Sequence, residues 1–177
     1  MISRRAFAYY VSAGAICASS LHILAMLGYA PFDIGTVVTI LLLVAAPAVM
    51  AMMAHADLRA RRVAGPRANP VDLFAAIPKW GRRLFLAVFY YAGLNFAAFL
   101  VMTGGGGVER RADGRYVLSE HGHFIRELDA KGVRAVHVWE VRMITGFLLP
   151  FLVFPGLYFF MAPSVSSGER KPHTPAA

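Results

Sequence analysis

The chain has 177 residues, of which 58% are hydrophobic and only 16% are charged. A soluble domain has about 45–50% apolar and about 25% charged residues, so this composition argues against an ordinary soluble protein. The formal net charge of +8 would suit a nucleic-acid partner, but no nucleic-acid-binding motif accompanies it. A basic surplus is also what retains membrane proteins on their cytoplasmic side. The lipid bilayer is therefore the expected surrounding, with no nucleic-acid partner.

The single cysteine, Cys17, lies in the middle of the first apolar stretch. One thiol forms neither an intramolecular disulfide nor a dithiol redox pair. This argues against the quinone-linked disulfide oxidoreductases with four helices, whose chemistry needs several cysteines. We interpret Cys17 as a small buried apolar residue.

The apolar residues gather in four blocks that predict four transmembrane helices, at residues 6–27, 34–54, 84–102 and 143–161. Each block has about 19–22 residues, enough to cross a hydrocarbon core about 30 Å thick. The basic start is typical of a signal peptide, but no convincing cleavage site follows, so we expect an uncleaved signal anchor. The predicted fold is an all-α membrane protein, a four-transmembrane-helix bundle. Residues 1–163 form its single domain, and residues 164–177 are expected to be a disordered cytoplasmic tail.

The lysines and arginines predict the orientation of these helices. Eleven lie in the N-terminus, the linker 57–83 and the tail, whereas the segment 103–142 holds seven and the link 28–33 none. Cytoplasmic loops carry the excess of basic residues. We therefore expect a multi-pass protein of the bacterial inner membrane with both termini in the cytoplasm.

The basic linker contains a predicted helix start at Asn69, Pro70 and Asp72. Asparagine caps helices, proline suits the first helical position, and an acid suits the positive helix end. Apolar residues follow, and Trp80 comes shortly after them. We expect a short helix in the headgroup region with Trp80 as interfacial anchor. The alternative is a docking surface for a cytoplasmic partner.

The segment between the third and fourth blocks predicts a small outer module. Gly104–Gly107 is expected to be a flexible link. Two β-favouring runs, 115–119 and 124–128, flank a glycine and predict an extramembrane β-hairpin. Asp129 can cap a helix that continues into the fourth block, with Trp139 and Arg142 at the membrane interface.

Three features of this module carry a resemblance: Arg115-Tyr116-Val117-Leu118, then His121-Gly122, then a helix entering the membrane through Glu140-Val141-Arg142. Over residues 113–145 the chain resembles a group of small uncharacterised four-pass bacterial inner-membrane proteins. The resemblance implies a comparable outer segment and no particular activity.

The four blocks contain no Asp, Glu, Lys or Arg in their interiors. Ion-coupled transporters place an ionisable group at membrane depth, so coupled transport is disfavoured. Polar groups in lipid seek partners inside a bundle. We predict an intramembrane polar cluster near the outer side, made of His22, Thr39, Asn95 and Thr145. It would either hold helices together or form the floor of a small site open to the outside.

The histidines raise two cofactor hypotheses. Haem between helices needs histidines at matching depth, and His22 and His55 lie near opposite ends of their helices, so haem is disfavoured. Outside the membrane, a Zn²⁺ or Cu²⁺ site is conceivable from nitrogen and oxygen ligands. Its candidate ligands are His121, His123, His137 and Glu140.

Sequence motifs of known enzymes are missing: the zinc-protease helix, the phosphate-binding glycine loop and Gly-x-Ser-x-Gly. We therefore expect no catalytic residues and no cofactor. The leading hypothesis is a non-enzymatic accessory, assembly or immunity-type subunit that contacts a protein partner, or a second copy, through its outer segment. The alternative is a membrane protein that binds a small molecule or metal with His22, Asn95 and the outer histidines.

Overall fold

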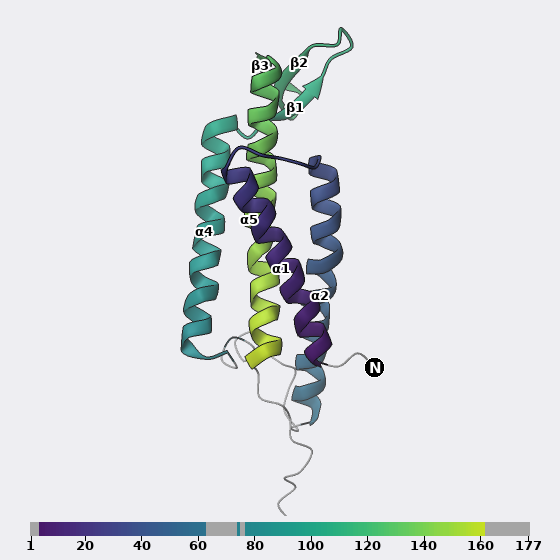
Figure 1. Ribbon diagram of the computed structural model, residues 1–177, viewed down its shortest axis with the longest axis vertical. Helices are drawn as coiled ribbons and strands as arrows, with labels where there is room; N and C mark the ends of the chain where they lie inside the picture. The colour runs from purple at the N-terminus through teal and green to yellow at the C-terminus, as the bar shows by residue number, and fades with distance from the viewer. Residues whose placement is uncertain (1–3, 63–73, 75–76, 162–177) are drawn as a thin grey trace, which may run out of the picture.

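The computed structural model describes residues 4–62, 74 and 77–161, and four long helices dominate this part of the chain (Figure 1). They are α1 (Arg4–Met26), α2 (Ile34–Arg62), α4 (Lys79–Thr103) and α5 (Ala130–Met161). All four are long and apolar enough to cross a membrane, which confirms the prediction of four such helices. The expected helix after Asn69, apart from Phe74, and the expected disordered tail 164–177 lie outside the described residues.

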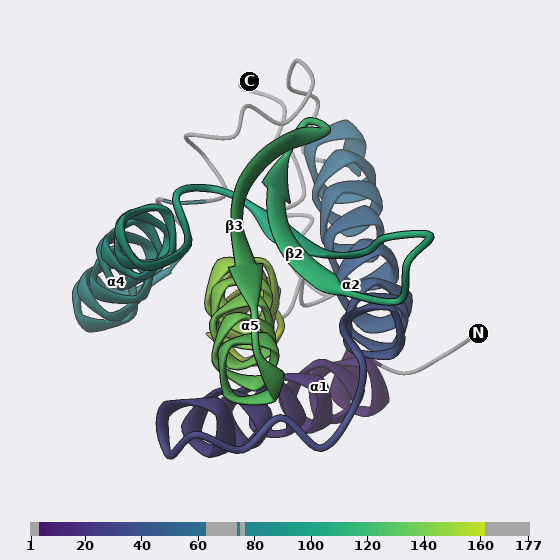
Figure 2. The same cartoon turned by 90° about the horizontal axis from the view of Figure 1, so that it is seen from above.

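Helix α5 is the centre of the helical part. Figure 2 shows α1, α2 and α4 on three sides of it, and each of them packs against it. An apolar helix that is buried nearly all round takes the central place in a domain. Much of the second half of α5 is buried accordingly, at Thr145, Gly146, Leu148, Leu149, Pro150, Leu152, Pro155, Gly156, Leu157, Tyr158 and Phe159. The other three helices are held mainly by their contacts with α5. The expectation that Cys17 is buried is wrong: it is exposed on α1, because the neighbouring Ala18 takes the buried side of that helix.

Two helices are longer than the sequence predicted. Helix α2 continues to Arg62 instead of ending near residue 54, and α4 begins at Lys79 instead of residue 84. Alanine and arginine are good helix formers, so the charged ends continue the helix although they are not apolar. Pro78, with φ −61° and ψ 155°, precedes α4 and fixes its start because proline disfavours helical backbone before it.

The link between α1 and α2 ends in a capped helix start. Both oxygens of the Asp33 carboxylate are used: Oδ1 accepts from the Thr36 amide at 2.9 Å and Oδ2 from the Thr36 hydroxyl at 2.5 Å. These bonds favour the ionised form, first the hydroxyl and then the amide, and they lower the pKa of Asp33 below its usual value.

Replacement of this cap gives a pH-dependent prediction. We expect Asp33→Ala to lower the melting temperature of the detergent-solubilised protein at neutral pH, because the Thr36 amide loses its acceptor. A lowered pKa contributes stability that is complete above the ordinary pKa of aspartate and is lost as the pH falls through the lowered value. The difference between wild type and variant should therefore shrink in acid. Asp33→Asn, which keeps an oxygen acceptor, is the control; a difference independent of pH would contradict the role of the charge.

A three-stranded antiparallel sheet stands between α4 and α5 in the chain, at one end of the helices (Figure 1). Its strands are β1 (Gly107–Arg110), β2 (Tyr116–Glu120) and β3 (His123–Leu128), in that spatial order. Strands β2 and β3 form the hairpin that the sequence predicts. Its two-residue turn has positive φ at His121 (50°) and Gly122 (80°), as the twist of a tight hairpin requires. Strand β1 was not predicted.

The four glycines after α4 are not the flexible link that the sequence suggested. Gly104 ends α4 with φ 64°, and Gly105 has φ 78°, conformations that favour glycine. A Cβ on Gly106 would lie 2.8 Å from the Ser119 backbone oxygen, and Gly107 already belongs to β1. The glycines therefore form a tight corner that brings β1 against β2.

Charged side chains support the sheet on its exposed side. The Arg115 guanidinium donates to Asp113 at 2.9 Å and to Glu127 on β3 at 2.8 Å. The Arg115 backbone amide and guanidinium hold the pKa of Asp113 below its usual value. These pairs are well exposed, so they set the geometry of the sheet more than its stability.

A candidate polar site and a neighbouring pocket

Three helices meet at His22, a side chain of α1 that is only 4% exposed. Its Nδ1 lies 2.8 Å from the Thr145 hydroxyl on α5, and its Nε2 lies 2.5 Å from the Tyr91 hydroxyl on α4. The Thr145 hydroxyl directs its one hydrogen to the Val141 carbonyl at 2.7 Å, with the Arg142 carbonyl also in reach at 3.2 Å. Nδ1 must therefore carry a hydrogen and donate it to Thr145. In the neutral ring, Nε2 then accepts from Tyr91.

Asn95 and Arg142 form a second, reciprocal contact between α4 and α5. The Asn95 amide nitrogen donates to the Arg142 carbonyl at 2.8 Å, and Arg142 Nε donates to the Asn95 side-chain oxygen at 2.8 Å. Asn95 is 3% exposed. The guanidinium also lies over the Trp139 ring, 4.6 Å from its centroid, a cation–π contact. A cation is thus held between an amide and an aromatic face.

Gly146 makes room for both contacts. A Cβ at this position would lie 2.6 Å from Asn95 Nδ2 and 3.2 Å from His22 Cε1. Only a residue without a side chain lets α1 and α4 approach α5 this closely with their polar groups. Small residues permit such approach in membrane helices.

We call these six residues the polar cluster: His22, Tyr91, Asn95, Arg142, Thr145 and Gly146. The structure places three of the four predicted members in it, since the Thr145 hydroxyl and the Asn95 amide also share the Arg142 carbonyl. Thr39 is a correction: it is exposed on α2, and no hydrogen bond among the described residues joins it to the cluster. The face of α2 that is buried carries Val37 and Leu41, each two residues away, or about 200° around the helix.

Sequence reasoning missed two polar side chains of the cluster, those of Arg142 and Tyr91, and it also missed Gly146. Arg142 was assigned only to the membrane interface, although it lies three residues before Thr145 and so on the same side of α5. Tyr91 lies four residues before Asn95 on α4, which also puts the two on one face. Searching the neighbours at three and four residues of each predicted polar position would have found both.

The hydrogen bonds of the polar cluster are suited to holding α1, α4 and α5 together. Within the described part of the chain, no buried side-chain nitrogen or oxygen lacks a hydrogen-bond partner. A fully paired network in a low dielectric rigidifies the helices that it joins. The cluster has no carboxylate and no cysteine, and its histidine is occupied on both nitrogens.

The candidate metal ligands lie in two settings. His121 lies in the hairpin turn and His123 begins β3, and the His121 side chain is 90% exposed. His137 lies on α5, where its Nε2 donates to the Phe32 carbonyl at 3.0 Å and its Nδ1 is 3.6 Å from Glu140. Among the described residues, no three His, Cys, Asp or Glu side chains are grouped to hold a metal ion. The metal site stays a prediction.

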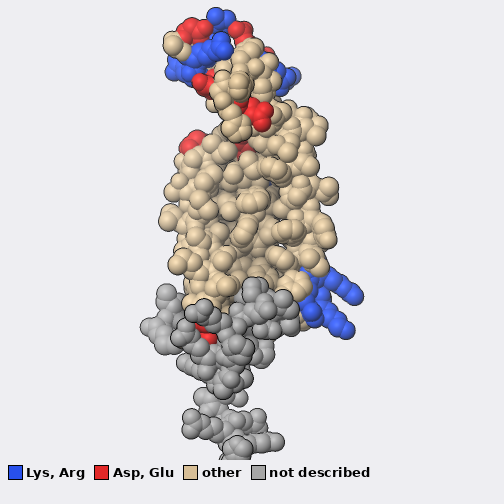
Figure 3. All heavy atoms as spheres, turned by 180° about the vertical axis from the view of Figure 1, so that it is seen from behind, with Lys and Arg blue, Asp and Glu red and all other residues tan. Residues whose placement is uncertain are grey.

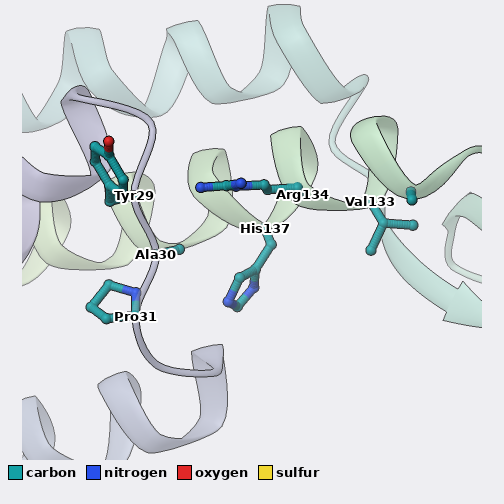
Figure 4. Close-up of a pocket in the computed structure, with 7 residues that line it drawn as sticks. Tyr29, Ala30, Pro31, Val133, Arg134 and His137 are labelled. Atoms are coloured by element: carbon teal, nitrogen blue, oxygen red, sulfur yellow. The ribbon is translucent and has the colours of Figure 1, made fainter.

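A pocket of about 470 Å³ lies beside His137 (Figure 4). One wall is the link between α1 and α2, with Tyr29, Ala30 and Pro31, and the other is the first two turns of α5. Figure 4 shows the Arg134 side chain extending along α5 on the side of Tyr29. The guanidinium carbon lies 6.0 Å from the Tyr29 ring centroid.

The described residues form a helical protein with four helices long and apolar enough to cross a membrane, and a small sheet lies at one end of them. The polar cluster joins three of these helices. Comparison with protein-family models, with curated proteins and with solved structures gives no match.

Proposed function

We propose that the chain is a multi-pass protein of the bacterial inner membrane with both termini in the cytoplasm. The support is the surface: Figure 3 shows an uncharged belt between charged groups at its two ends. Trp80, 56% exposed, lies at the start of α4, and Trp139 lies toward the sheet end of α5. From Trp139 to Met161, α5 rises about 33 Å, close to a hydrocarbon core of about 30 Å. The two tryptophans suit the two interfaces.

The charge balance of the two ends supports this orientation. The segments 1–5, 55–83 and 162–177 hold eleven Lys and Arg against three Asp and Glu, so they carry the whole net charge of +8. The segments 27–33 and 103–142, at the sheet end, hold seven of each. The basic end corresponds to the cytoplasmic side, which puts the sheet outside.

For its function, we propose a non-enzymatic accessory, assembly or immunity-type subunit that contacts a protein partner through the sheet. The observation that carries this is β3. It is an edge strand of six residues, and every residue except Leu128 is exposed. Edge strands present unpaired backbone N–H and C=O groups, which a partner strand can use.

The apolar side chains of β3 add to this surface. Phe124 is 52% exposed and Ile125 is 41% exposed, at the point where the pairing of β3 with β2 shifts by one residue. Only Asp129 separates β3 from α5, and its carboxylate caps that helix by accepting from the Gly132 amide at 2.6 Å. A partner on β3 would thus be tied almost directly to the central helix.

A matched pair of arginine substitutions tests this proposal. Arg126 on β3 and Arg110 on β1 are both exposed, at opposite edges of the sheet. We expect a partner that co-purifies stoichiometrically from native membranes to be lost or weakened about tenfold or more by Arg126→Glu, because charge reversal in an interface disfavours association. Arg110→Glu should retain it.

The measurement is quantitative mass spectrometry of complexes isolated in mild detergent, with the melting temperature of each variant as a check on folding. Equal recovery of the partner with both variants would place the contact elsewhere than on β3. Recovery of the chain without any stoichiometric protein would count against an accessory role and favour the ligand-binding alternative, which the pocket supports.

A further inference from the structure

The pocket beside His137 holds one cation that the fold leaves available. Among the described residues, no carboxylate lies within ion-pair distance of the Arg134 guanidinium, whose contact is with the face of Tyr29. Two acids flank Arg134 in the chain: Asp129 caps α5 from the position before it, and the Glu140 carboxylate lies 3.6 Å from His137 Nδ1. An arginine presents five N–H donors in a planar fork that fits the oxygens of a phosphate.

The other walls of the pocket offer shape and apolar contact. His137 already donates through Nε2 to the Phe32 carbonyl, so it forms a fixed wall. Ala30, Pro31 and Val133 complete a lining that is otherwise apolar. The volume of about 470 Å³ is within the range of small-molecule sites, about 300–1,000 Å³, and far exceeds one phosphate ion.

The place of the pocket in the fold suggests the kind of molecule that reaches it. It lies where α1 ends and α2 begins, next to the ends of the apolar stretches Ala6–Met26 and Ile34–Leu58. Two exposed apolar residues stand in or beside the same link, Leu27 at 67% and Phe32 at 48%. A molecule with a phosphate head and an apolar tail would meet the guanidinium and these side chains together.

We propose that this pocket binds the phosphate headgroup of an anionic phospholipid, with Arg134 as the phosphate-binding residue and Tyr29 and Pro31 as walls. The shared chemistry is a phosphate ester, so a soluble phosphate ester is the competing source. The site is independent of the partner proposed for β3, because it uses none of the exposed side chains of that strand.

The test uses the full-length protein in detergent and two sets of probes. Native mass spectrometry follows binding of phosphatidylglycerol and, for comparison, zwitterionic phosphatidylcholine. Calorimetry follows glycerol phosphate and inorganic phosphate. We expect phosphatidylglycerol to bind, and Arg134→Gln to weaken its binding about tenfold or more, because a charge-assisted pair to phosphate is lost. Arg126→Gln, an equal loss of charge on β3, should leave it unchanged.

Any other result contradicts the proposal or changes its ligand. Equal phosphatidylglycerol affinity in Arg134→Gln and wild type, equal binding of both lipids, or no binding would overturn the proposal. If glycerol phosphate binds as tightly as the lipid and depends on Arg134, the pocket takes soluble phosphate esters and its lipid assignment is wrong. Since Arg134 is exposed, its replacement should leave the melting temperature unchanged, so a failure to fold would not be confused with a loss of binding.

Discussion

Replacement of Gly146 by alanine is expected to destabilise the detergent-solubilised protein by about 1–3 kcal/mol, because the added methyl group overfills the polar cluster. The new Cβ would lie 2.6 Å from Asn95 Nδ2, too close for any van der Waals contact. Asn95 would have to move away from the Arg142 carbonyl, and the shift would weaken both bonds of the reciprocal pair. The backbone of α5 cannot retreat, since other helices pack on it from three sides.

The control is Gly93→Ala on α4. A Cβ there meets no atom within 4 Å, so the same substitution adds a methyl group in open space. Alanine favours a helix over glycine by about 1 kcal/mol in water, so this variant should melt at the wild-type temperature or slightly above it. Thermal unfolding of both variants, followed by intrinsic fluorescence, gives the comparison. If the two variants have the same melting temperature, the packing around Gly146 is less tight than its distances indicate.

The long apolar blocks could be predicted because their length and composition suffice. The helix ends could not be predicted from hydropathy, because α2 and α4 both continue into charged residues. The end of α2 depends on helix propensity, and the start of α4 is fixed by Pro78. Strand β1 was missed for a related reason. Its first residue is Gly107, and a glycine run predicts flexibility unless the contact of Gly106 with the Ser119 backbone is known.

The position of the polar cluster along the helix axes could be predicted, but the rotation of each helix about its axis could not. His22, Asn95 and Thr145 were grouped by depth, and the structure joins them. Thr39 has the same depth, yet α2 turns Leu41 inward and leaves Thr39 outside. One residue of helix is about 100° of rotation, so depth alone leaves the facing side open. Arg142 was not predicted as a member because it lies just before the fourth apolar block. Its side chain nevertheless reaches Asn95 and donates a hydrogen bond to it.

Replacement of Asn95 by leucine is expected to lower stability by about 1–3 kcal/mol, because it removes the Asn95 bond to the Arg142 carbonyl and leaves Arg142 Nε without its acceptor in a partly buried setting. Polar contacts between membrane helices contribute about 0.6 kcal/mol on average and at most about 1.7 kcal/mol. A measured loss above about 1.7 kcal/mol would mean that the unpaired Arg142 guanidinium adds to the destabilisation.

A double-mutant cycle separates the two contributions. If Arg142 is responsible, Arg142→Met combined with Asn95→Leu should lose less stability than the two single changes together, with a coupling of about 0.5 kcal/mol or more. The control is Thr39→Val, which removes a hydroxyl from the exposed side of α2 and should leave the melting temperature unchanged. An unchanged melting temperature in Asn95→Leu would exclude adhesion as the role of this contact. The floor of an outward-facing site would then be the better interpretation of a buried amide that holds an arginine in place.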